Sequence, residues 1–318
     1  MMVKTIKKDA PWLAPLAGYS DIAFRLVCRK YGASLAFTEM VSAKGIEYNN
    51  ATTQELLRTE ENDNPLVVQL FGNDPDNIRS SIHALQKQGF SAFDLNVGCS
   101  VPKVVKTGSG AALLKEPSHL YSIAKAMVEE AGEGNIGIKI RLGWNQEQEN
   151  YLTVGKMLED AGVAWITIHP RYAKQGYSGV ADWDKIKQLV ESVSIPIIAS
   201  GDLFTAQDAY KCMTHTQAAT VLFARGALSN PAIFEEYTAL MQGKQYIRAK
   251  IQEVVRCHLT YLQQYMPEQR ALVRLRSILP RYYKGYSNKH ILHERTLHAT
   301  SFEDIYQLIS YMEEDYAH

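Results

Sequence analysis

Short apolar runs recur along the first 240 residues of the chain, and amphipathic stretches separate them. The runs are rich in β-branched and aromatic residues, which is typical of buried strands. Eight of them are predicted as strands, at residues 12–15, 35–40, 66–71, 92–96, 137–141, 165–169, 195–200 and 220–224.

The stretches between these runs carry helix start and stop signals. Helices are predicted at residues 21–31, 77–88, 117–131 and 147–161, and each is followed by a glycine. Alternation of strand and helix favours a parallel sheet. Eight such units in roughly 240 residues predict an α/β fold, a (β/α)8 TIM barrel. A doubly wound sheet is the alternative, but the repeat count disfavours it and no G-x-G-x-x-G follows the first strand.

The pattern changes after about Gly243. Residues 249–265, 270–283 and 302–316 have helical periodicity, and no strand pattern lies between them. We therefore expect two domains: a catalytic barrel over residues 1–243 and a small all-helical domain over residues 244–318.

Composition narrows the class of protein. Hydrophobic residues make up 46% of the chain, enough for a large core, and no run of about 18 apolar residues predicts a membrane helix. The first eight residues carry lysines without a following apolar segment, so no signal peptide is expected and the prediction is cytoplasmic. The four cysteines are far apart, which fits neither a zinc site nor a disulfide framework, and no metal is expected.

Chemically active residues gather where the predicted strands end. The active site of a TIM barrel lies at the carboxyl ends of its strands, so these side chains should converge on one mouth. The residues in question are Pro15, Leu16, Ala17, Gln69, Asn96, Cys99, Lys139, Arg141, His169, Arg171, Ser200, Gly201, Asp202, Ala224, Arg225 and Gly226.

The last two strand ends predict a phosphate site. TIM barrels commonly bind phosphate in the loops after strands seven and eight, where Gly201 and Gly226 allow close backbone approach and Arg225 adds positive charge. The alternative is that both glycines only form tight turns.

Lys139 and His169 each end an apolar strand. A lysine in an apolar run is costly unless it faces an anion, and a reduced flavin with charge near N1 is such an anion. A lysine whose head reaches solvent at the rim is the alternative. A lone histidine is more often structural, and the strand-end position of His169 makes a functional role an equal alternative.

Cys99 lies beyond its strand, unlike the other three cysteines, which fit helix cores. Its loop also holds Lys103, Lys106, Gly108 and Gly110, and such a loop can move as a lid. A cysteine here can act as a nucleophile or as a proton donor, and the sequence does not choose between them.

These motifs together resemble the tRNA-dihydrouridine synthases over nearly the whole barrel. The most specific is D-L-N-V-G-C-S-V-P-K-V at residues 94–104, supported by A-P-L-A-G-Y-S-D at 14–21, V-Q-L-F-G at 68–72, K-I-R-L-G-W at 139–144 and H-P-R-Y-A-K-Q-G-Y-S-G at 169–179. The chain departs from the family pattern at Ser100, where proline is usual, and at Tyr172, Ser200 and Ala224.

The resemblance implies a set of roles. FMN is expected to be held by Pro15, Leu16, Ala17, Gln69, Lys139, His169, Ser200, Gly201, Asp202, Ala224 and Arg225, and to be reduced by NADPH or NADH. Hydride would then pass to C6 of a uracil in tRNA while Cys99, as general acid, protonates C5. Substrate contacts are expected from Asn96, Arg141, Arg171 and Arg276, and the base must leave its stack.

The helical segment adds a local charge to a chain with no net charge. Between residues 245 and 295 there are ten basic residues and three acidic ones, with Tyr282, Tyr283 and Tyr286 interleaved. A basic, aromatic stretch of this kind is typical of RNA binding. A solvated helix face is the alternative.

Two other functions fit parts of this pattern. An FMN barrel acting on a small molecule, such as a dihydroorotate or dihydropyrimidine dehydrogenase, shares the phosphate loops and Lys139 but leaves the basic segment unexplained. A catalytically inactive RNA-binding protein explains that segment but not the combination of Asn96, Cys99 and Lys139. The sequence does not indicate which uridine is modified.

Overall fold

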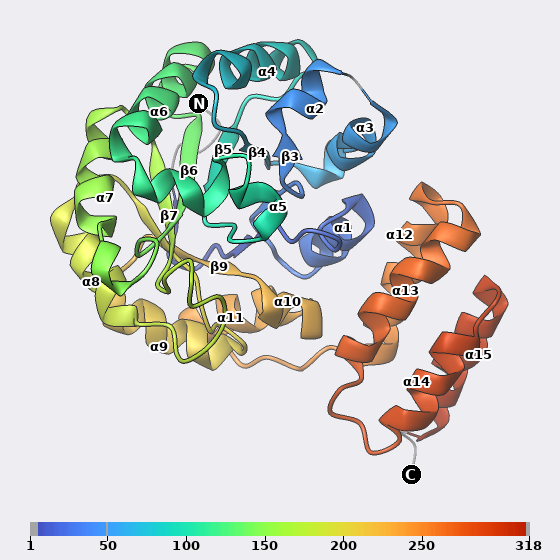
Figure 1. The fold of residues 1–318 in the computed structure, drawn as a ribbon. Coiled ribbons are helices and arrows are strands. Elements are labelled where there is room, and N and C mark those ends of the chain that lie inside the picture. The colour runs from blue at the N-terminus through green and yellow to red at the C-terminus, as the bar shows by residue number, and fades with distance from the viewer. Residues whose placement is uncertain (1–5, 49, 316–318) are drawn as a thin grey trace.

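A computed structural model describes residues 6–48 and 50–315, and its centre is a closed parallel barrel (Figure 1). The strands follow one another around the barrel, β1 pairs with β9, and β2 pairs with β4. They are β1 Trp12–Leu13, β2 Leu35–Phe37, β3 Val41–Ser42, β4 Leu66–Phe71, β5 Phe93–Val97, β6 Ile136–Arg141, β7 Trp165–His169, β8 Ile197–Ala199 and β9 Thr220–Phe223. The predicted TIM barrel is confirmed.

The second predicted strand, residues 35–40, ends early at Phe37, and the unpredicted β3 begins beyond it at Val41. β2 and β3 both pair with β4, and the Thr38 amide between them still donates to the Val67 carbonyl at 3.0 Å. The Thr38 hydroxyl accepts a hydrogen bond from the Gln69 backbone, and the Glu39 carboxylate accepts one from the Gly18 backbone. Side-chain acceptors thus hold the segment between β2 and β3 against β4 and against the turn at Gly18. The other seven strands differ from prediction by at most two residues at either end.

Helices surround the barrel as Figure 1 shows. They are α1 Ile22–Lys30, α2 Ala43–Glu47, α3 Ala51–Leu57, α4 Pro75–Lys87, α5 Pro102–Val105, α6 Pro117–Ala131, α7 Tyr151–Asp160, α8 Trp183–Ser192, α9 Ala206–Thr216, α10 Arg225–Ser229 and α11 Ile233–Met241. The helix predicted from residue 147 begins only at Tyr151, because residues 146–148 form a separate 3-10 turn.

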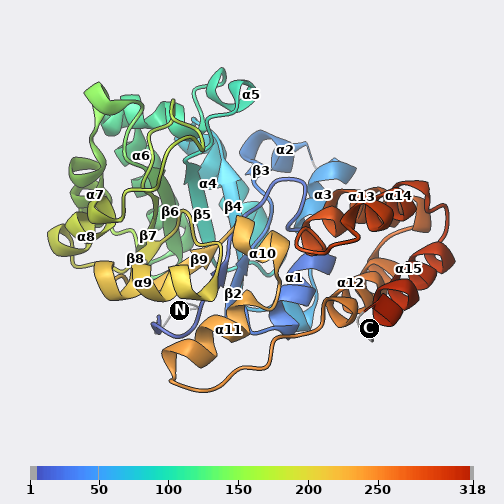
Figure 2. The ribbon, with the colours of Figure 1, turned by 90° about the horizontal axis from the view of Figure 1, so that it is seen from below.

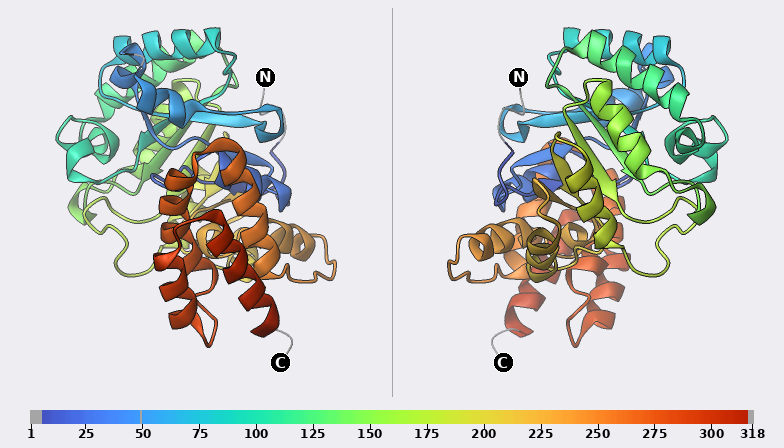
Figure 3. Two further views of the ribbon diagram at one scale, coloured as in Figure 1. Left: turned by 90° about the vertical axis from the view of Figure 1, so that its right-hand side faces the viewer. Right: turned by 90° about the vertical axis from the view of Figure 1, so that its left-hand side faces the viewer.

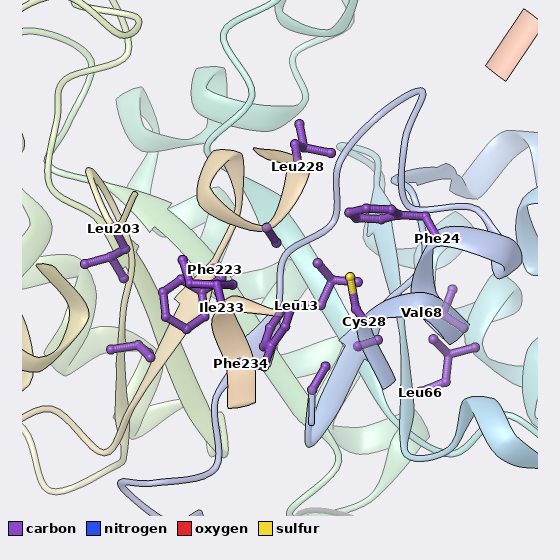
Figure 4. Packing of buried hydrophobic residues seen from close by; sticks show 14 of the residues in the cluster. Leu13, Phe24, Cys28, Leu66, Val68, Leu203, Phe223, Leu228, Ile233 and Phe234 are labelled. Atoms are coloured by element: carbon purple, nitrogen blue, oxygen red, sulfur yellow. The ribbon is translucent and has the colours of Figure 1, made fainter. Parts of the chain in front are cut away.

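The outward faces of the strands pack against these helices. Figure 4 shows part of this layer, where Phe223 of β9 meets Phe234 of α11 edge-to-face at a centroid distance of 5.4 Å. Burial of such large apolar side chains is the main stabilising contribution in a barrel of this size.

The side chains that point into the barrel form a second apolar cluster, on the amino-terminal side of the polar strand ends. Its members are Trp12, Ala14, Leu35, Phe37, Val67, Ala92, Trp165, Ile198 and Leu222. The Trp165 indole occupies the space beside Gly137, where a Cβ atom would lie 2.0 Å from the ring. A side chain at position 137 is therefore incompatible with this packing.

Four helices follow the barrel after an irregular connection at residues 244–250: α12 Ile251–Tyr265, α13 Glu268–Tyr282, α14 Lys289–His298 and α15 Phe302–Asp315. The sequence predicted three of them. It missed α14 because the apolar residues of this short, histidine-rich helix do not fall on one face. Residue 316, the predicted end of the last helix, lies outside the described residues. No helix in residues 6–48 and 50–315 is long and apolar enough to cross a membrane.

The helical segment lies to one side of the barrel and packs against α1 (Figures 2 and 3). His258 of α12 is central to this contact. Its ring lies 5.9 Å from the ring of Phe24 in α1, and its Nδ1 atom is 2.9 Å from the Tyr282 hydroxyl of α13. Buried residues of the segment and of the barrel belong to one continuous apolar cluster. The division at residue 243 stays a prediction.

The buried His258 makes the stability of the docked segment sensitive to acid. Burial lowers the pKa of His258 to about 3, so the folded protein keeps it neutral while the unfolded chain takes up a proton near pH 6.5. This group therefore lowers the free energy of unfolding as pH falls below 6.5, by about 1.4 kcal/mol per pH unit.

We predict that His258→Gln, which keeps a polar partner for Tyr282, flattens the dependence of stability on pH between 6.5 and 5. Urea unfolding at several pH values measures this slope. His290→Gln, at an exposed position on α14, is the matched control and should behave as wild type. An unchanged slope in His258→Gln would show that His258 does not cause the acid sensitivity.

Candidate active site at the barrel mouth

The inward faces of the strands change from apolar to polar near their carboxyl ends. On β5 and β6 the inward positions above the apolar cluster hold Asp94, Asn96, Lys139 and Arg141. β7 adds His169 at its last position. The parallel register sets Asn96 beside Lys139 and Arg141 beside His169, while Asp94 lies one level lower, opposite Gly137.

Two adjoining pockets open at this mouth and share six lining residues: Pro15, Leu16, Lys139, His169, Tyr177 and Arg225. One extends to the turns after β8 and β9, where Ser200, Gly201, Asp202 and Ala224 line it. The other extends to the Cys99 loop and is lined by Ala17, Gln69, Asn96, Cys99 and Arg141. Fourteen of the sixteen expected site residues thus line one continuous opening.

Arg171 is one of the two that do not line it. Only 2% of its surface is exposed, and its guanidinium donates to both Asp202 carboxylate oxygens and to the backbone carbonyls of Ser178 and Gly179. A guanidinium committed in this way holds loops together, and the structure gives no support to its expected contact with substrate.

Arg276 is the other. It lies on α13, and its Nη2 atom donates to the Ala299 carbonyl at 2.7 Å, away from both pockets. Any contact of Arg276 with RNA would therefore lie outside the mouth, and this residue stays an untested prediction.

The turn after β8 has the backbone geometry of a close-approach site. Gly201 has φ +110°, and a Cβ there would lie 2.8 Å from the His169 ring. The Asp202 carboxylate binds Arg171 and also Arg225, whose Nη2 atom is 3.0 Å away. Burial favours a raised pKa for Asp202, but hydrogen bonds from Arg171 and Ala181 outweigh it and lower the pKa. The ionised Asp202 therefore holds Arg225 at the edge of the pocket.

His169 enters the mouth as a neutral imidazole. Burial, reinforced by Lys139 and the surrounding arginines, lowers its pKa to about 2. Its Nε2 atom lies 3.1 Å from Nη1 of Arg171, which can only donate, so Nε2 must accept and Nδ1 must carry the proton. His169 can therefore offer an N–H donor to a bound molecule.

Lys139 is a half-buried cation at the floor of both pockets. Among the residues that the structure describes, none forms an ion pair with it within 4 Å. Burial, reinforced by Arg141, lowers its pKa to about 8, while Asp94 acts in the opposite direction. A half-buried ammonium with no ion-pair partner among the described residues fits a ligand that carries or develops negative charge.

Cys99 is half-buried in a loop whose backbone is held from two sides. The Cys99 amide donates to Oδ1 of Asn96 at 2.8 Å, and the Cys99 carbonyl accepts from the Ala111 amide at 2.9 Å. Gly110 has φ +63°, and a Cβ there would lie 2.6 Å from the Cys99 carbonyl oxygen. The other three cysteines are buried, as expected from their helical positions.

Several lining residues were not predicted. Tyr177 is 63% exposed, and its ring centroid lies 5.9 Å from the His169 imidazole centroid and 4.4 Å from the Arg225 guanidinium carbon. Tyr177 lies in the motif at residues 169–179, so the sequence offered a reason to include it among the site residues. The Arg281 guanidinium of α13 covers the ring of Tyr19 at 4.8 Å, and both line the pocket of Cys99. No local pattern links residues 262 positions apart, so only the fold reveals this pair.

Comparison with known proteins places this geometry in a family. The model of the family described as dihydrouridine synthase matches residues 12–310. A probable tRNA-dihydrouridine synthase of Treponema pallidum is 34% identical over 314 residues, covering 95% of this chain and 92% of the relative. A probable tRNA-dihydrouridine synthase of Aquifex aeolicus is 33% identical, with 95% and 96% covered. For tRNA-dihydrouridine synthase B of Pasteurella multocida, the sequence identity is 33%, and the alignment covers 74% of this chain and 70% of the relative.

Solved structures show the same fold at low sequence identity. An old yellow enzyme homologue of Zymomonas mobilis superposes with a TM-score of 0.51 at 10% identity, covering 79% of this chain and 90% of that one. Morphinone reductase superposes with a TM-score of 0.53 at 12% identity, covering 76% of this chain and 87% of that one. These similarities support the barrel architecture.

Proposed function

This chain belongs to the dihydrouridine synthase family, and we propose that it acts in the cytoplasm on tRNA. In the proposed reaction it reduces the C5=C6 bond of one uridine to 5,6-dihydrouridine, with FMN as the bound flavin and NADPH or NADH as the reductant. The observation that carries the proposal is the single opening that joins Lys139 and the β8–β9 turns to the Cys99 loop.

The residues at the mouth fit FMN in chemistry. Arg225 and the Gly201 turn offer positive charge and accessible backbone for the phosphate. Pro15 and Leu16 give an apolar wall, and Lys139 supplies the cation for the flavin ring. Bound FMN supplies a hydride to C6 of the uracil.

The other half of the reaction needs a proton at C5. Cys99 lines the same opening, and we assign its thiol the role of general acid for the enolate that develops as C6 is reduced. We assign Arg141 to the uracil carbonyls. Its Nε and Nη1 atoms already donate to the carbonyls of Gly98, Tyr172 and Gly176, which fixes the guanidinium at the pocket wall.

RNA is favoured as the substrate over a free pyrimidine because the helical segment reaches the mouth. Arg281 of α13 lines the Cys99 pocket and also a second groove, which Lys244, Arg248 and Lys284 border. The charge excess of the segment is smaller than the sequence indicates. Arg256 and Arg270 pair with Glu313 and Glu55, which lie outside residues 245–295.

We predict that the purified protein carries FMN, and that Lys139→Met weakens binding of the reduced flavin at least about tenfold, or ~1.4 kcal/mol. Lys185→Met removes a surface lysine paired with Glu149 and is the control. Flavin absorbance measures the FMN content of the purified protein, and titration of the apoprotein measures the flavin affinity of each variant. Anaerobic addition of tRNA to the reduced enzyme should then reoxidise the flavin. A colourless protein that does not bind added FMN contradicts the proposal.

A second prediction concerns Cys99. Cys99→Ala should accept electrons from NADPH at a near-normal rate but reduce uridine about 10²–10⁴-fold more slowly, the usual contribution of a positioned acid. Rapid-mixing measurements of the two half-reactions separate these steps. Cys212→Ala, in the buried core of α9, is the control. If Cys99→Ala reduces uridine as fast as wild type, the assigned role is wrong.

A third prediction concerns the affinity for RNA. With about four phosphate contacts, Kd should rise about 50-fold between 50 and 200 mM salt, because bound counterions are released. Arg281→Gln combined with Lys284→Gln should reduce this salt dependence. Arg256→Gln, at a residue paired with Glu313, is the matched control. Equal affinity at the two salt concentrations would exclude an electrostatic RNA interface.

A further inference from the structure

A buried carboxylate that the proposed reaction does not use lies beneath the mouth. Asp94 of β5 is completely buried, and its Oδ2 atom accepts a hydrogen bond from Nε2 of Gln69 at 2.7 Å. Its other oxygen, Oδ1, has no hydrogen-bond partner among the described residues. A buried polar group with so few partners is costly, so its presence calls for a role beyond stability.

The contact with Asp94 determines how the next two amides are oriented. An ionised carboxylate only accepts, so Gln69 must turn its NH2 group towards it and its Oε1 atom away. That Oε1 atom accepts from Nδ2 of Asn96 at 2.8 Å. The Oδ1 atom of Asn96 in turn accepts from the backbone amides of Gly98, at 3.2 Å, and Cys99, at 2.8 Å.

The result is a directed chain of hydrogen bonds from Asp94 to the Cys99 backbone. Its ends are fixed, because a carboxylate accepts and a backbone N–H donates, and the two amides between them have one arrangement that satisfies both. Burial raises the pKa of Asp94 to about 7, but the partnerless Oδ1 can take the proton while Oδ2 still accepts. The direction of the chain is therefore the same in both protonation states.

We propose that Asp94 is a positioning residue for Cys99: acting through Gln69 and Asn96, it fixes the loop that aims the thiol into the mouth. The value of this positioning for uridine reduction rests on the proposed function. The positioning itself is a property of the resting protein and is testable without RNA or turnover. Loss of the Asp94 acceptor leaves Gln69 free to rotate, and the Cys99 amide then loses a fixed partner.

Alkylation of the thiol by iodoacetamide reports on the loop directly. Cys28, Cys212 and Cys257 are buried, so modification of the folded protein is confined to Cys99. Asp94→Leu should accelerate this alkylation at least about fivefold, since one lost hydrogen bond of ~1 kcal/mol opens the loop by that factor. Asp94→Asn keeps an acceptor for Gln69 and should stay within about twofold of wild type.

Two further variants separate positioning from general damage to the barrel. Thr167→Val removes a buried hydroxyl of β7 that has no hydrogen-bond partner in the part of the protein that the structure describes and that lies outside this series of hydrogen bonds. The alkylation rate of Cys99 should therefore be unchanged in this variant. Gln69→Leu breaks the chain one link later and should reproduce Asp94→Leu, which keeps the test valid if Asp94→Leu does not fold. The double variant Asp94→Leu/Gln69→Leu should react no faster than either single variant.

The outcomes distinguish the two proposals. Equal alkylation rates in wild type, Asp94→Leu and Gln69→Leu overturn the positioning role, whatever reaction the enzyme catalyses. Asp94→Asn behaving like Asp94→Leu also overturns it, because charge rather than an oriented acceptor would then matter. The expected rates support the role even if no variant, wild type included, forms dihydrouridine, a result that would contradict only the proposed function.

Discussion

The polar side chains that point inward from β5, β6 and β7 lie above a buried apolar layer. The Trp165 indole fills this layer, and it fits only because position 137 on the neighbouring strand has no side chain. This packing closes the barrel below the pockets. Charges placed directly above it lose solvation on one side, so their protonation states depend on one another and on whatever occupies the mouth.

The loss of solvation changes the pKa values of three groups that lie above the apolar layer. Burial lowers the pKa of Lys139 to about 8, raises the pKa of Asp94 to about 7, and keeps His169 neutral. The mouth therefore offers the Lys139 ammonium together with arginine side chains, a neutral N–H donor and a network of amides. Such a surface suits a ring system that gains negative charge on reduction. In the proposed reaction, the Cys99 loop at the other end of the opening supplies the proton.

The sequence was informative about features that repeat or lie close together in the chain. Strand periodicity gave the barrel, and fourteen of the sixteen expected site residues line the opening at the strand ends. It did not reveal contacts between residues that lie far apart in the chain. Arg171 binds Asp202 where a loop folds over it, and Arg281 reaches Tyr19 because α12 docks on α1. The segment between β2 and β3 is held by side-chain acceptors that strand propensities do not register.

The most direct test of the account is the map of dihydrouridine in tRNA from cells that lack this gene. We expect dihydrouridine to disappear at a defined tRNA position, to return with the wild-type gene, and to remain absent or much reduced with a gene encoding Cys99→Ala. A tRNA profile that is identical with and without the gene, in cells that have no second enzyme for the same position, would contradict the account.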